Sequence, residues 1–145
     1  MITLDMIYDC SLKDCLSRVW GDRESITVLE ILDLVHHPLN ACATLEQFCT
    51  PKTLDLAMHL IMKHAIKKMP LDVKKWAEKW PNVSIEETKD LMSHWKKANG
   101  VKIFPVLSAA CERDLKEVIR GLYYSKCLSP EELIACCKEA LNTEG

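Results

Sequence analysis

The residues of this sequence best suited to chemistry are its five histidines and eight cysteines: Cys10, Cys15, Cys42, Cys49, Cys111, Cys127, Cys136 and Cys137. Zinc is bound by cysteine or histidine pairs separated by a few residues, and Cys10/Cys15 and His59/His64 fit that spacing only loosely. On a predicted helix, His59 and His64 lie well off one face. We therefore expect mostly reduced thiols in or near the core, with structural zinc and disulfides as the alternatives.

A catalytic role finds little support among the motifs. The sequence has no Gly-x-Gly-x-x-Gly, no phosphate loop ending in Gly-Lys-Ser/Thr, no Gly-x-Ser-x-Gly and no His-Glu-x-x-His. A reactive thiol lies at a helix N-terminus or near basic groups, and Cys42 and Cys127 come closest to this, each without a designated partner. We expect no enzyme, no metal and no cofactor, and a thiol-dependent enzyme is the third hypothesis.

The composition is that of an ordinary globular protein. The chain has 145 residues, of which 48% are hydrophobic and 28% charged, so extensive disorder is excluded. The length predicts one domain over residues 1–145. No apolar stretch is long enough to span a bilayer, and the first 25 residues do not resemble a secretory signal. These observations predict a cytoplasmic or nuclear protein.

The elements that must position these residues are predicted to be helices, because hairpin dipeptides and alternating strand patterns are almost absent. We expect an all-α fold, either a compact bundle or a superhelical array of seven to eight short helices. The predicted helices span 11–20, 25–37, 40–49, 51–69, 72–80, 84–99, a segment from 105 to about 122, and 129 to the C-terminus. Their expected N-terminal caps include Ser11, Ser25, Asn40, Thr50, Ser84 and Ser129.

Charge is unevenly distributed along the chain. Residues 1–62 hold 4 Lys and Arg against 9 Asp and Glu, whereas residues 63–102 hold 10 Lys against 5 acidic residues. Trp76 and Trp80 lie within this basic segment, where lysines could contact phosphates while the rings stack on bases. The same two rings also fall on the apolar stripe of their helix, and no Arg is present, so nucleic acid is the alternative partner and not the favoured one.

One stretch resembles a known family. The string from Thr88 to Lys97, with Leu91 and Trp95, is similar to the last helix of the amino-terminal helical domain of transcription elongation factor S-II, and residues 69–73 are similar to a turn in that domain. The resemblance covers about thirty residues. It implies binding of short peptides from other proteins, and no site residue is transferred from it.

The helix over 51–69 carries apolar residues on nearly all sides, which favours either a central core helix or a helix with an exposed docking face. In the second case Met62 and its neighbours form a groove edged by lysines, suited to an amphipathic helix with acidic flanks. Self-association as a homodimer would cover the same face. The candidate partner-binding residues are Leu56, Leu60, Met62, Lys63, Lys67, Lys74, Lys75 and Lys79.

Together these patterns favour an intracellular protein–protein interaction module, such as an adaptor, a regulatory protein or a host-directed viral factor. The expected partner is another protein or an amphipathic, acidic peptide.

Overall fold

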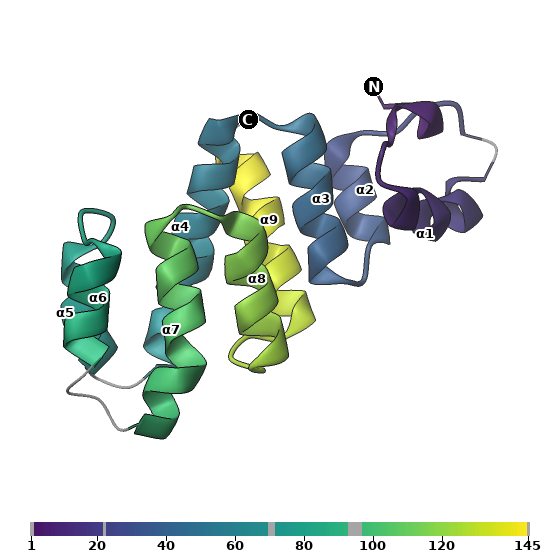
Figure 1. Ribbon diagram of the computed structural model, residues 1–145. Helices are drawn as coiled ribbons and strands as arrows, with labels where there is room; N and C mark the ends of the chain where they lie inside the picture. Colours follow the sequence, from purple (N-terminus) through teal and green to yellow (C-terminus); the bar gives the residue numbers. More distant parts are fainter. Residues whose placement is uncertain (1, 22, 70–71, 93–96, 145) are drawn as a thin grey trace.

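The computed structural model describes residues 2–21, 23–69, 72–92 and 97–144, and this part of the chain is all-α, as predicted. A short 3-10 turn, η1 (Leu4–Met6), precedes nine α-helices within these residues, rather than seven or eight (Figure 1). They are α1 (Cys10–Trp20), α2 (Val28–Leu34), α3 (Pro38–Phe48), α4 (Pro51–Lys67), α5 (Asp72–Lys79), α6 (Ile85–Met92), α7 (Lys97–Cys111), α8 (Leu115–Tyr124) and α9 (Pro130–Glu144). None of the helices described is long and apolar enough to cross a membrane.

Three helices begin at cap residues that the sequence predicted. Thr50 caps α4, and Pro51 occupies the first helical position, where a missing N–H costs nothing. Ser84 caps α6 through its hydroxyl. Ser129 and Glu132 form a complete capping box at α9, in which each side chain accepts the other residue's backbone N–H at 3.2 Å. These side chains satisfy N–H groups that have no partner within the helix.

The first two helices use different caps from those predicted. Asp9, not Ser11, caps α1, and Thr27, not Ser25, caps α2 together with Glu30. Asp, Ser and Thr are all good caps, so local sequence alone does not choose between neighbours.

Pro38 begins α3, whereas the sequence analysis used it only to end the preceding helix and placed the cap at Asn40. The cap is His37, whose Nδ1 accepts the backbone N–H of Leu39 at 3.1 Å. Histidine is not a common cap residue, so the pattern did not identify this start.

The two helices predicted over 84–99 and from 105 onward are three helices in the structure. α6 ends at Met92, and residues 99–100 lie within α7 instead of ending a helix. α7 continues through Pro105 and ends at Cys111. The chain then turns because Arg113 adopts a left-handed backbone conformation with φ 58°. This break accounts for the additional helix.

The break between α7 and α8 is a Schellman motif, built without glycine. Arg113 donates its backbone N–H to the Ala110 carbonyl at 3.2 Å, and Asp114 donates to the Ala109 carbonyl at 2.9 Å. Asp114 then caps α8. Lys126, with φ 60°, occupies the equivalent left-handed position after α8. Glycine usually fills this position, which explains why the turn at Arg113 was not visible in the sequence, whereas a break between residues 122 and 129 was predicted.

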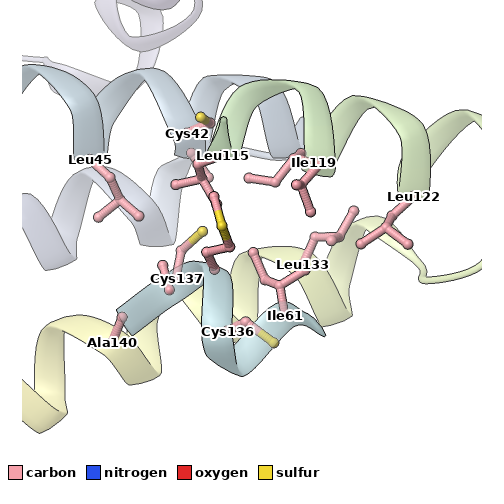
Figure 2. Packing of buried hydrophobic residues seen from close by; sticks show 14 of the residues in the cluster. Cys42, Leu45, Ile61, Leu115, Ile119, Leu122, Leu133, Cys136, Cys137 and Ala140 are labelled. Atoms are coloured by element: carbon pink, nitrogen blue, oxygen red, sulfur yellow. The ribbon is translucent and has the colours of Figure 1, made fainter. Parts of the chain in front are cut away.

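The helices form an elongated array, with α1 near one end and the α5–α6 hairpin at the other (Figure 1). In the centre α4 packs against α9, α7 packs against α8, and α3 packs on both α8 and α9. Figure 2 shows how side chains from α3, α4, α8 and α9 meet in the core. The buried residues labelled there are Cys42, Leu45, Ile61, Leu115, Ile119, Leu122, Leu133, Cys136, Cys137 and Ala140.

Candidate functional site

The groove predicted around Met62 is not formed in this structure, because the Met62 side chain is 0% exposed. Leu56 and Leu60 are half-buried and pack against the core. The cause is that α3, α8 and α9 all pack against α4, so much of its apolar surface is buried within the chain. Met62 is therefore corrected from a groove residue to a core residue.

The predicted lysines lie on the surface. Those on α4 and α5 are all exposed: Lys63, Lys67, Lys74, Lys75 and Lys79. Only Lys79 among them lies near an acidic side chain of the described residues, at 3.9 Å from Glu87. None of these five lines the cavity described next, but Lys63 and Lys67 add positive charge to the same helix that ends beside it.

A surface cavity of about 560 Å³ lies where the C-terminal ends of α4 and α8 meet the start of α9. We call it the α4/α8/α9 cavity. Its lining residues are Lys68, Tyr123, Tyr124, Lys126, Cys127, Leu128, Ser129, Pro130 and Glu132. Aromatic side chains are enriched on surfaces that bind other proteins, where a few large anchors contribute most of the affinity.

The turn after α8 positions the wall of this cavity. Lys126 donates its backbone N–H to the Tyr123 carbonyl at 3.2 Å, and Cys127 donates to the Leu122 carbonyl at 3.1 Å. This second Schellman motif reverses the chain, so that Leu128 is buried against the core and Lys126 is exposed.

The two tyrosines have different environments. The ring of Tyr123 is half-buried, and its centroid lies 4.8 Å from that of His37, the residue that caps α3. Tyr124 contacts Tyr123 edge to face at 5.1 Å but is itself 67% exposed. A tyrosine supported by a second ring loses little freedom on binding, which makes Tyr124 a suitable anchor for a partner.

Two lining residues of the cavity form an ion pair. Lys68 Nζ lies 2.9 and 3.0 Å from the two carboxylate oxygens of Glu132. This hydrogen bond from Lys68, with a second from the Ser129 backbone, lowers the pKa of Glu132, so the carboxylate is charged at neutral pH. Lys126 is exposed and makes no ion pair with any described residue, so it remains available to an acidic partner.

The cavity thiol is not suited to nucleophilic chemistry. Burial raises the pKa of Cys127, and its sulfur lies 3.9 Å from the Ala65 carbonyl oxygen. A catalytic cysteine needs a lowered pKa, so that its thiolate is present at neutral pH. Burial also raises the pKa of Cys42, the other candidate nucleophile, and the nearby Glu46 carboxylate adds to that shift.

All eight cysteines are free thiols in the structure. Burial raises the pKa of Cys136 to about 11 and that of Cys137 to about 12. Within residues 2–21, 23–69, 72–92 and 97–144, no three histidine, cysteine or acidic side chains gather as metal ligands would.

The tryptophans of the basic segment take part in packing. Trp76 is buried and donates its indole N–H to Thr88 Oγ1 at 2.9 Å. Trp80 is half-buried, donates to the Ala110 carbonyl at 3.1 Å, and stacks on Trp76 with the ring centroids 5.9 Å apart. The Trp76 ring is thus not available to stack on bases, which weakens the nucleic-acid alternative.

Sequence reasoning did not single out Tyr123, Tyr124 or Lys126. A signal was present, because the apolar stripe of α8 runs through Val118 and Leu122 and leaves the last residue of the helix, Tyr124, outside it. The cavity itself joins residues about sixty positions apart, and no local pattern reports such a contact.

No protein-family model, curated protein or solved structure matches this chain. The stretch that resembles transcription elongation factor S-II includes residues 93–96, which lie outside the described residues. Any assignment of function therefore rests on the chain's own geometry.

Proposed function

We propose that this chain is a protein–protein interaction module that holds a short acidic segment of a partner protein in the α4/α8/α9 cavity. The observation that carries the proposal is the exposed Tyr124 side chain, supported by Tyr123 and flanked by the free Lys126 ammonium group. Tyrosine is a frequent anchor of protein interfaces.

Each wall of the cavity has a part in this binding. Leu128 and Pro130 are apolar lining residues, against which an aliphatic or aromatic side chain of the partner would lose contact with water. Lys126 would pair with an Asp or Glu of the partner, and the exposed Lys63 and Lys67 would attract the same acidic segment during encounter. The partner is therefore a peptide with one apolar anchor and at least one neighbouring carboxylate.

The proposed setting is the cytoplasm or the nucleus, because free cysteines persist in reducing compartments. An adaptor, a regulatory protein or a host-directed viral factor would all use such a module. Nucleic acid remains the alternative partner of the basic segment, and a steep loss of affinity with added salt would support it.

The experiment is a selection of random displayed peptides on the full chain, followed by rescreening against two variants. Tyr124→Asp places a charge in the cavity, whereas Tyr8→Asp makes the same change at a tyrosine that is 82% exposed and outside the cavity. We expect the selection to enrich acidic peptides that contain an apolar residue. These peptides should bind the Tyr8→Asp variant and fail to bind the Tyr124→Asp variant. Enrichment of basic peptides, or equal binding to both variants, would contradict the proposal.

A further inference from the structure

The α4/α8/α9 cavity has few charged groups in its lining. Among the described residues these are two ammonium groups, Lys68 and Lys126, and one carboxylate, Glu132. Lys68 Nζ lies 2.9 and 3.0 Å from the two carboxylate oxygens of Glu132, whereas Lys126 makes no ion pair within the described part of the chain. A carboxylate of the chain itself therefore already occupies one of the two cations that an acidic partner could use.

The Glu132 side chain is held in place by the start of its own helix. Its Oε1 accepts the backbone N–H of Ser129 at 3.2 Å, and Ser129 Oγ accepts the backbone N–H of Glu132 at 3.2 Å. Lys68 comes from a different part of the chain, the C-terminal cap of α4, 64 residues earlier. The position of the carboxylate at the cavity therefore does not depend on Lys68 alone.

The start of α9 does not require the negative charge of Glu132. A capping box accepts glutamine as well as glutamate at this position, so the cap needs an oxygen atom and not a charge. The side chains of Lys68 and Glu132 are 48% and 42% exposed, and ion pairs this exposed contribute little to stability. Because both side chains line the cavity, a molecule that enters it comes close to this charge.

An acidic segment in the cavity would be sensitive to the Glu132 charge. A partner carboxylate that approaches Lys68 would meet the two Glu132 oxygens beside the same ammonium group, and like charges so close together repel each other. Lys126 has no such competing carboxylate among the described lining residues. The folded chain thus offers the partner one ammonium group of the lining and not two.

We propose that Glu132 is a specificity-determining residue of the α4/α8/α9 cavity, which occupies Lys68 and thereby limits the number of carboxylates that a partner segment can place there. The segment that fits is weakly acidic, with its carboxylate at Lys126, and strongly acidic segments are disfavoured. This inference rests on the function proposed above and identifies which acidic segments the site selects.

Parallel selections of random displayed peptides on the unaltered chain and on Glu132→Gln test this role. The variant keeps an oxygen for the Ser129 cap and releases Lys68. Glu131→Gln is the matched control, because it removes the same charge from the neighbouring residue of α9, which is exposed and outside the lining. We expect the peptides enriched on Glu132→Gln to carry more acidic residues on average than those enriched on the unaltered chain or on Glu131→Gln.

Calorimetric titration of one peptide enriched on Glu132→Gln tests whether the effect passes through Lys68. This peptide should bind Glu132→Gln about two- to fivefold more tightly than the unaltered chain. Adding Lys68→Gln to Glu132→Gln should remove most of this gain, and thermal melting verifies that each variant is folded. A gain that persists in the double variant would overturn the role of Glu132 in occupying Lys68.

The selections also separate a failure of this inference from a failure of the proposed function. Acidic peptides enriched on all of these chains with the same number of acidic residues would overturn the role of Glu132 and leave the binding proposal in place. Acidic peptides enriched on Glu132→Gln alone would support the role of Glu132 and contradict the binding of acidic segments by the unaltered chain. Enrichment of no acidic peptide on any of them would overturn both proposals.

Discussion

Gly121 of α8 approaches Val106 of α7 so closely that a Cβ atom on Gly121 would lie 2.7 Å from Val106 Cγ2. Alanine at an ordinary helix position stabilises by about 1 kcal/mol relative to glycine. Here the stiff, buried valine cannot easily yield, so we expect Gly121→Ala to destabilise the fold by about 1–3 kcal/mol. Urea unfolding measures this, and the added variant Val106→Ala should reduce the cost of Gly121→Ala. A stabilising Gly121→Ala would show that the two helices are not in this contact.

The hydrogen bond between Trp76 and Thr88 joins α5 to α6 inside a buried environment. Thr88→Val keeps the shape of the side chain but leaves the Trp76 N–H without its acceptor. We expect a loss of about 1–3 kcal/mol in unfolding free energy. Thr88→Ser is the matched control, because it keeps the hydroxyl and removes only a methyl group. Equal losses for the two variants would assign the effect to packing.

The ion pair between Lys68 and Glu132 predicts that the stability of the fold falls at low pH. Because the pKa of Glu132 is lowered in the folded chain, its charge stabilises the fold above the unfolded value of about 4.3, and this contribution is lost as the pH falls through the folded value. Glu132→Gln keeps an oxygen for the Ser129 capping box but removes the charge. The variant should melt below the wild type at pH 7 and show a smaller difference near pH 3. A difference in melting temperature that is the same at pH 7 and near pH 3 would show that the charge of Glu132 does not stabilise the fold.

The cysteines should divide into two classes of reactivity. Cys10 and Cys15 are exposed, whereas burial raises the pKa of Cys136 to about 11 and that of Cys137 to about 12. Since the thiolate is the reacting form, iodoacetamide at about pH 8 should modify Cys10 and Cys15 first and leave Cys137 protected until the chain unfolds. Peptide mass spectrometry reports the order in which the cysteines are modified.

The raised pKa values of Cys136 and Cys137 also predict a loss of stability at high pH. Their contribution to the free energy of unfolding is fully present below the unfolded pKa of about 8.5 and is lost as the pH rises toward 11.

How far the sequence predicts this fold depends on whether the controlling interaction is local. The starts at Thr50 and Ser129 and the stop at Gly21 are encoded within a few residues, and the structure has helices there. Arg113 takes the left-handed position that glycine usually occupies, so the turn it forms was not visible. The segment from 105 to about 122, which spans parts of α7 and α8, was therefore predicted as one helix.

The candidate site was harder to predict for the same reason. The pattern of α4 showed that Met62 is apolar, but whether it faces solvent depends on α8 and α9, which come much later in the chain. The five candidate lysines of α4 and α5 are exposed in the structure, but none of them lines the cavity. The cavity joins Lys68, at the end of α4, to the turn at Lys126 and the start of α9, a long-range arrangement without a local signature.

The central claim is that Tyr124 anchors an acidic partner segment, and calorimetric titration of a selected acidic peptide tests it most directly. The titration compares the unaltered chain with Tyr124→Ala and with Tyr8→Ala, which truncates an exposed tyrosine outside the cavity. We predict that Tyr124→Ala weakens binding at least tenfold, about 1.4 kcal/mol or more, and that Tyr8→Ala changes it less than twofold. Unchanged affinity for Tyr124→Ala, or an equal loss for Tyr8→Ala, would contradict the assignment of this cavity as the binding site.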